Sequence, residues 1–491
     1  MSTSVLARGR PERALAWLVL GQLVLWSLAP ALSHTAPPLD VVEMYAWGRE
    51  HVVATFKHPN LPGLVLEATR WLTGGATGWP AYVVSQIFIG VTFWAAFALG
   101  RDLMDAKRAL AGVLFLTGVY FFFWPTPEFN HNVAQMPLWA LTILFLWRAT
   151  NEAKLSSWLL LGLFGGLSLW AKYSSAVLLV VAAAWILWDA QARKKLLTPG
   201  PWLALVVFAL VAAPQAIWLV QHQFEPFAYA ERRAGGGNVF APFAFLLTLA
   251  ADHAPAFLLL LAAGFFGKAA VDAPPRPEQR TMRFLLLLGL GPAVLTALGG
   301  LLGGASLRAS WAAPMFALSG LLMIAWLAPQ FSEARLKRLA IGAGVMLVLG
   351  SSLYFAHMRF GAQFTNHPLK GNWPQAELSH DLQAAWRDET NAPLRIVGGD
   401  IWTAGLVGLD SRDPPHVLIN GDYAISPWVT REDVARDGVL LVWREGDTVP
   451  PSLAALAQGL EVKTVIVPFE HFPHAQPVTL HYAVIRPAVR P

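Results

Sequence analysis

The chain contains no cysteine, and only 14% of its 491 residues are charged. The absence of thiols excludes a disulfide scaffold, a thiolate metal site and a cysteine nucleophile. The hydrophobic fraction is 55%, with 22 Trp and 28 Phe, which is too apolar for an ordinary soluble protein. Composition therefore predicts a polytopic α-helical membrane protein.

Eleven apolar runs are candidates to cross a bilayer, which takes about 20 residues per helix. The first follows Arg8, Arg10 and Arg13 as a signal sequence would, but it lacks a clear small-residue cleavage site, so we expect it to be retained. The runs lie at 14–32, 80–100, 109–124, 132–148, 156–171, 173–189, 201–220, 243–266, 283–301, 310–328 and 339–356.

The basic residues are distributed unevenly between the two sides of this arrangement. With a cytoplasmic N-terminus, 18 of the Lys and Arg in residues 1–355 fall on the cytoplasmic side and seven on the other. The positive-inside rule then places the long first loop and the C-terminal region on the periplasmic side of a bacterial inner membrane. Because the surplus of base lies in short loops between apolar runs, it indicates topology and no nucleic-acid partner.

The sequence changes character near Ala356, which predicts a transmembrane domain at 1–356, with its first periplasmic loop at 33–79, and a periplasmic α/β domain at 357–491. Short β-rich runs separated by Gly, Asp and Pro lie within 393–410, 415–421, 438–445 and 462–469. Helical patterns lie at 374–390 and 451–460. The alternation of the two patterns favours a small α/β domain.

The first loop carries an unusual density of polar groups, beginning with "LDVVEMYAWGRE". Asp40 and Glu43 are three residues apart and share one face of a helix, and Trp47 lies one further turn along it. Asn60 with Pro62 begins a second helix, "LPGLVLEATRWL". We expect two helices at the membrane surface, with Lys57 and His58 standing between them.

Further polar residues fall on the same side of the membrane, in the loops that follow. Ionisable groups at membrane depth are costly and usually functional, so their convergence on one leaflet predicts a single outward-facing site. These residues are Asn130, His131, Asn132, Lys172, Arg232, Arg233 and Arg308.

Such a mixture suits attack on a sugar whose leaving group is a lipid phosphate. Positive charge stabilises the negative charge that develops on the leaving phosphate. A carboxylate takes the proton from an acceptor hydroxyl. We assign the base to Asp40 or Glu43, and a sugar-facing role to Tyr45 and Trp47. The phosphate is assigned to Lys57, Lys172, Arg232, Arg233 and Arg308, and further substrate contacts to His58, Asn130, His131 and Asn132.

Five motifs resemble, in order, those of polyprenyl-phosphate-sugar-dependent glycosyltransferases of the C fold. They are "LDVVEMYAWGRE…KHPNLPG", "FNHNVAQMPLWAL", "LSLWAKYSSAVLL", "YAERR" and "LRASWAAPMF". This family includes protein O-mannosyltransferases, lipid A aminoarabinose transferases and rhizobial galacturonosyltransferases. The resemblance covers residues 14–330 and differs from the commonest form at Val41 and Asn60. It implies that Asp40 occupies the position of the family's catalytic acidic residue. It also implies that Lys57 and Lys172 lie near the donor phosphate. It also implies an undecaprenyl-phosphate sugar as donor, and lipid A, core sugars or proteins as acceptors.

Simpler interpretations stay open beside these assignments. Asp40 suits a helix N-cap, Lys57 an interfacial side chain that snorkels, and Lys172 a helix-end anchor. The histidines match no metal-ligand spacing, so no metal site is assigned, and a divalent cation stays open as a cofactor. The alternative function is a transporter or flippase of a lipid-linked precursor, with Asp252 as its best membrane-embedded residue. Neither internal repeats nor several mid-membrane charges favour that alternative, so we expect an inverting glycosyltransferase.

Overall fold

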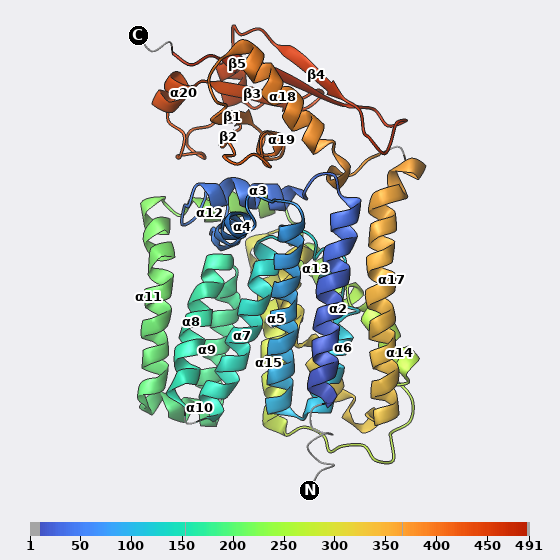
Figure 1. The fold of residues 1–491 in the computed structure, drawn as a ribbon. Helices are drawn as coiled ribbons and strands as arrows, with labels where there is room; N and C mark the ends of the chain where they lie inside the picture. Colours follow the sequence, from blue (N-terminus) through green and yellow to red (C-terminus); the bar gives the residue numbers. More distant parts are fainter. Residues whose placement is uncertain (1–9, 153, 366, 489–491) are drawn as a thin grey trace.

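The computed structural model describes residues 10–152, 154–365 and 367–488. Three layers follow one another in space (Figure 1): a bundle of long helices, a thin layer of short helices lying across its end, and a sheet domain beyond that layer. The site described below lies where the first two layers meet.

The bundle consists of apolar helices that pack side by side. Its longer members are α2 (Arg10–Ser33), α5 (Trp79–Leu103), α7 (His131–Asn151), α8 (Leu155–Ala171), α9 (Ser175–Trp188), α11 (Pro199–Gln221), α15 (Gln279–Gly303) and α17 (Glu333–Thr365). Shorter pieces complete it: α6 (Ala106–Leu116), η1 (Tyr120–Phe122), α10 (Ala190–Lys194), η2 (Lys195–Leu197), α13 (Ala241–Ala251), α14 (Ala254–Ala263), η3 (Ala309–Leu318), α16 (Ser319–Trp326) and η4 (Ala328–Gln330).

Not all of the eleven expected spans form long, uninterrupted apolar helices. Among the described residues, seven helices are long and apolar enough to cross a membrane, or eight if the bent pair at 175–197 is one span. The expected span at 109–124 is interrupted, because α6 ends at Leu116 and a 3-10 turn follows. Gly118, in this interruption, packs closely on another segment, since a Cβ there would lie 2.6 Å from the backbone of Ala256. The expected span at 310–328 likewise begins as the 3-10 helix η3.

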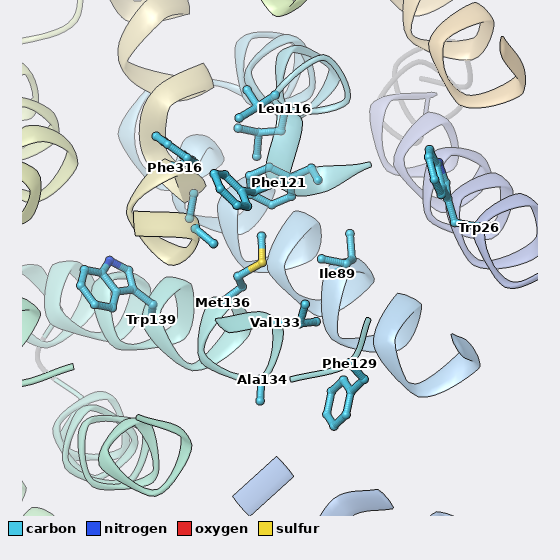
Figure 2. Close-up of a cluster of buried hydrophobic side chains, with 14 of the residues drawn as sticks. Trp26, Ile89, Leu116, Phe121, Phe129, Val133, Ala134, Met136, Trp139 and Phe316 are labelled. Carbon is cyan, nitrogen blue, oxygen red and sulfur yellow. The ribbon is translucent and has the colours of Figure 1, made fainter. Parts of the chain in front are cut away.

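Large buried side chains hold the bundle together at the end nearest the site. Figure 2 shows Phe121 and Phe316 side by side in a cluster that also contains Ile89 and Met136. The two rings stack with centroids 5.5 Å apart. Because Met136 belongs to the first turns of α7, this cluster fixes the start of that helix, where the polar residues of the site begin.

The layer of short helices consists of α3 (Leu39–Arg49), α4 (Leu61–Leu72) and α12 (Glu225–Ala234). The bounds of α4 match the predicted second helix, and the predicted loop 33–79 lies between the end of α2 and the start of α5. The helices α3 and α4 approach closely at two glycines, since a Cβ on Gly48 would lie 2.2 Å from the carbonyl oxygen of Gly63. Asn60 donates to the carbonyls of Trp47 and Val52 and so ties the ends of the two helices together.

The sheet domain has the mixed order β2-β1-β3-β5-β4. Strands β1 (Ile396–Gly399), β2 (His416–Ile419) and β3 (Val439–Arg444) are parallel, and β5 (Val478–Ile485) pairs antiparallel with β3 and β4 (Lys463–Val467). Its helical pieces are η5 (Lys370–Asn372), α18 (Gln375–Glu389), α19 (Ile401–Leu406), α20 (Arg431–Asp437) and α21 (Pro451–Ala457). The sequence missed β5 and α20. It also placed the end of the membrane domain at 356, whereas α17 continues to Thr365.

The loops that the charge count placed on the cytoplasmic side meet at the end of the bundle opposite the sheet domain (Figure 1). Ion pairs join them there: Arg101 with Glu12 at 3.3 Å, and Arg148 with Asp102 at 2.6 Å. The basic loops and the sheet domain therefore lie at opposite ends of the helices.

Candidate functional site

A pocket of about 620 Å³ opens beneath α3, between the starts of α7 and α9, the helix α12 and the start of η3. It brings together residues that lie up to 272 positions apart in sequence, from Leu39 to Trp311. Ten of the predicted site residues line it: Asp40, Glu43, Lys57, His58, Asn130, His131, Asn132, Lys172, Arg233 and Arg308.

Asp40 sits in the first turn of α3, with Pro38 at the N-cap position, so it is not the helix cap that the simpler interpretation expected. Asn130 donates from Nδ2 to Asp40 Oδ2 at 2.9 Å. The same Asn130 caps α7, because its Oδ1 accepts from the backbone N–H groups of Asn132 and Val133. One side chain thus fixes both the start of α7 and the orientation of the Asp40 carboxylate.

Glu43 and Lys57 form an ion pair inside the pocket. Lys57 Nζ lies 2.8 and 3.0 Å from the two Glu43 carboxylate oxygens, and Glu43 is only 4% exposed. Burial raises the pKa of Glu43 to about 7, and Lys57 opposes that rise. Burial acts to lower the pKa of Lys57, but Glu43 more than offsets it, so Lys57 keeps its positive charge.

Lys172 lies in the turn between α8 and α9, outside the spanning helices, and its side chain is buried. Its Nζ donates to Asn132 Oδ1 at 2.6 Å. Burial lowers the pKa of Lys172 to about 8, with Asp40 raising it and Lys57 lowering it further. The amine is a cation at neutral pH whose charge is poorly compensated by its surroundings.

Two histidines form one wall of the pocket. The rings of His58 and His131 are 4.4 Å apart, and His131 Nε2 lies 3.0 Å from the carbonyl oxygen of Pro59. Burial holds the pKa of His58 well below its usual value, and His131, Lys172 and Lys57 lower it further. His58 is therefore neutral at pH 7 and can only donate or accept hydrogen bonds.

The helix α12 presents one of its two adjacent arginines to the pocket. Arg233 lines it together with Tyr229, one turn earlier, whereas Arg232 does not line it. Residues four apart share a helix face and neighbours do not, so the position of Tyr229 distinguishes the two arginines. Arg308 lines the pocket from the residue preceding η3.

Tyr45 and Trp47 are placed elsewhere than the sequence assigned them. Trp47 lies on the expected face of α3, but it is fully buried, with Lys57 Nζ 5.7 Å from its ring and His131 beside it. Tyr45 is two residues from Glu43 and so lies on a different face of α3. There burial and then Glu67 raise the pKa of its hydroxyl, and Arg70 lowers it. Neither ring lines the pocket, which corrects the prediction that they contact the sugar.

Glu128, in the loop before α7, is not among the assigned site residues but contacts Asp40. Its Oε1 accepts the backbone N–H of Asp40 at 3.1 Å. Burial, and then the charge of Asp40, raise the pKa of Glu128 to about 7. Tyr229 and Trp311 line the pocket but were missed, although both belong to quoted motifs, "YAERR" and "LRASW".

Within the described part of the chain, no group of three or more His, Asp or Glu is arranged to hold a metal ion. A divalent cation therefore stays a prediction.

Asp252, the residue favoured for a transporter, lies at the break between α13 and α14 and does not line this pocket. Its carbonyl oxygen accepts the backbone N–H of Tyr120 at 3.0 Å.

Comparisons with known proteins show which proteins this chain resembles. Residues 57–218 match the family model described as dolichyl-phosphate-mannose-protein mannosyltransferase. The chain is 26% identical over 432 residues to the lipopolysaccharide core galacturonosyltransferase RgtA of Rhizobium johnstonii. The alignment covers 82% of this chain and 83% of RgtA. Over a shorter stretch of 140 residues it is 33% identical to the undecaprenyl phosphate-alpha-4-amino-4-deoxy-L-arabinose arabinosyl transferase of Erwinia tasmaniensis, covering 27% of this chain and 24% of that one.

The fold has a solved counterpart. The crystal structure of ArnT from Cupriavidus metallidurans bound to undecaprenyl phosphate superposes with a TM-score of 0.63. The superposition covers 95% of this chain and 98% of that one, at 13% sequence identity. Both the helical bundle and the sheet domain are therefore included in the shared fold.

Proposed function

Because the chain is a membrane glycosyltransferase of the C fold, we propose that it transfers a sugar from a polyprenyl-phosphate donor to an acceptor of the bacterial cell envelope. The acceptor class that we favour is lipopolysaccharide, in its lipid A or core region. We further propose that the site faces the periplasm from the inner membrane. The relatives named above support the donor and acceptor classes, and the separation of basic loops from the sheet domain supports the orientation.

One observation carries the proposal: a single pocket combines an oriented carboxylate with several cations. Asp40 is held by Asn130 at one end, and Lys172, Arg233 and Arg308 line the remainder. A negatively charged leaving group and a hydroxyl nucleophile need these two features close together.

In the proposed reaction Asp40 takes the proton from the acceptor hydroxyl as its oxygen attacks the anomeric carbon. The bond from that carbon to the phosphate oxygen breaks, and the leaving polyprenyl phosphate keeps the bonding electron pair. Lys172 and the two arginines stabilise the negative charge on it. A single displacement of this kind inverts the configuration of the sugar.

Lys57 and Glu43 take different roles from those of a free cation and a free base. Lys57 donates to both Glu43 oxygens, which leaves the third N–H of its ammonium group for a phosphate oxygen. Glu43 is occupied by Lys57, which favours Asp40 as the base.

The test is sugar transfer in membranes supplied with labelled polyprenyl-phosphate sugars. Asp40→Asn keeps the size of the side chain but removes the base, so we expect a loss of about 10²–10⁴-fold. The control is Asp381→Asn, an exposed carboxylate on α18, which we expect to leave transfer unchanged. Unchanged transfer in Asp40→Asn would move the chemistry to Glu43 or Glu128.

The paired arginines of α12 provide a matched test of donor binding. Arg233→Ala removes a cation that lines the pocket, so we expect the KM for the donor to rise by about tenfold. Arg232→Ala removes the same charge one residue away, outside the pocket, and should leave the donor KM within about twofold of wild type. Equal effects in both variants would contradict a specific contact and indicate long-range attraction of the donor.

A further inference from the structure

A second group of cations and aromatic rings lies outside the pocket, where the sheet domain meets the end of α17. It consists of Lys370 in η5, Trp373 immediately after it, Trp402 in α19 and Arg444 at the end of β3; we call it the indole cluster. The indole rings lie 5.6 Å apart at an interplanar angle of 72°. Lys370 Nζ lies 5.2 Å from the Trp402 ring, and Arg444 Cζ lies 5.6 Å from the Trp373 ring.

The two indoles are buried, whereas the two cations they support are exposed. Contact with a ring face positions a cation without using its N–H donors, which remain free for an anion. Neither Lys370 nor Arg444 forms an ion pair with the described residues. By contrast, Lys463 and Arg486 in the same domain share the carboxylate of Glu389. The indole cluster therefore contains two positioned cations that form no ion pair with the described residues.

The cluster lies outside the pocket but is coupled electrostatically to residues around Asp40. Lys370 does not line the pocket, yet its charge acts on Glu128, which accepts the Asp40 N–H. The charges of Glu128 and Asp40 act in turn on Lys370, after burial and Asp400. A group held at Lys370 thus lies near Asp40 without occupying the space proposed for the donor.

The sheet domain holds the cluster in a fixed position relative to Asp40. The helix α19, which carries Trp402, rests on α3, where a Cβ on Gly405 would lie 2.6 Å from Val42. Val42 is two residues after Asp40. Any ligand of the cluster is therefore placed by the same contact that places the base.

We propose that the indole cluster binds the negatively charged group, a phosphate or a carboxylate, of a lipid-anchored acceptor glycan and so aligns an acceptor hydroxyl with Asp40. This inference rests on the proposed function. The donor is the less suitable ligand, because the pocket already supplies cations for its one phosphate. An uncharged acceptor would form no charge-assisted contact with the two cations.

The experiment uses the full-length protein in phosphatidylcholine vesicles with a labelled polyprenyl-phosphate sugar. The acceptor probe is purified lipopolysaccharide core glycolipid, either intact or after removal of its acidic groups. We expect the double variant Lys370→Ala/Arg444→Ala to raise the acceptor KM by about tenfold or more, with kcat and the donor KM within about twofold. Lys370→Arg keeps the charge and should retain the wild-type acceptor KM. The increase should disappear with the probe that has lost its acidic groups.

Arg431→Ala is the matched control, because Arg431 also lies over a ring in the same domain, 4.9 Å from that of Tyr423. It should leave the acceptor KM unchanged. An unchanged acceptor KM in the double variant, or an equal rise in the donor KM, would overturn the proposal. So would a defect that appears only when anionic lipid is added to the vesicles, since the cluster would then bind the membrane surface.

Direct binding of fluorescently labelled core glycolipid to the purified protein separates this proposal from the proposed function. If wild type binds the probe about tenfold more tightly than the double variant but transfers no sugar, the cluster is supported and the proposed function is wrong. If transfer occurs and both proteins bind the probe equally, the proposed function stands and the cluster does not bind the acceptor.

Discussion

Replacing Lys57 with methionine separates its two suggested roles, partner of Glu43 and ligand of the donor phosphate. The substitution keeps the length of the side chain and removes the amine. The hydrogen bonds of 2.8 and 3.0 Å that hold the Glu43 carboxylate are then lost, and among the described residues no other donor is recorded for it. An almost fully buried carboxylate is left without compensation.

The expected loss of stability follows from this geometry. Breaking a buried ion pair from one side costs about 3–5 kcal/mol. The side chain of Lys57 is 21% exposed, so water can replace part of its contact with Glu43. Burial already raises the pKa of Glu43 to about 7, so this carboxylate can become neutral by binding a proton. Both effects reduce the cost, so we expect Lys57→Met to lose about 2–3 kcal/mol.

The double variant Glu43→Gln/Lys57→Met provides the decisive comparison. Because no buried charge remains, its stability should return to within about 1 kcal/mol of wild type. Its kcat/KM for the donor should stay about tenfold or more below that of Glu43→Gln alone, since the phosphate has lost a cation. The assays are the soluble fraction after heating in detergent and transfer at varied donor concentration. Wild-type transfer by the double variant would refute the phosphate role, and an unaltered stability of Lys57→Met would refute the reasoning about the ion pair.

Three further predictions concern other parts of the site. The pKa of Lys172, lowered to about 8 by burial, predicts that kcat/KM for the donor falls about tenfold per pH unit above pH 8, with no such fall in Lys172→Arg. Burial raises the pKa of Glu128 from 4.5 to about 7, so this group lowers stability as pH rises between those values; thermal unfolding should show Glu128→Gln more stable than wild type above pH 7 and nearly equal at pH 4.5. Asn130→Asp keeps the cap of α7 but replaces the donor to Asp40 with a like charge, so transfer should fall about 10- to 100-fold while thermal stability changes little, and Asn130→Ala should lose both.

Much of the first loop could be predicted because its signals are local. Asn60 and Pro62 define the start of α4, and the three-residue spacing of Asp40 and Glu43 puts both on one face of α3. The same rule, applied two residues further, shows why Tyr45 faces away from the pocket. The available signal for Tyr229 was equally local, since it lies one turn before Arg233 on α12.

Other features depend on contacts between distant segments and leave no local trace. The interruption after Leu116 contains the close contact of Gly118 with Ala256, which the apolar run 109–124 does not reveal. Trp47 lies on the predicted face, but its burial depends on Lys57 and His131, which come from other elements. The strand β5 is different: its alternating buried residues Val478, Leu480 and Tyr482 were visible as a period of two in the sequence.

The helix α3 explains why so polar a segment lies beside a membrane. Its charged residues lie on more than one face, since Asp40 and Glu43 are on one side and Arg49 is about half a turn away. Asp40 and Glu43 face the pocket, whereas its C-terminal end contacts the sheet domain, through Arg49 to Asp413 at 2.8 Å and Glu50 to His416 at 2.9 Å. The same helix therefore carries the proposed base and the docking surface of the sheet domain. Through these contacts the sheet domain supports the helix that carries Asp40 as well as the indole cluster.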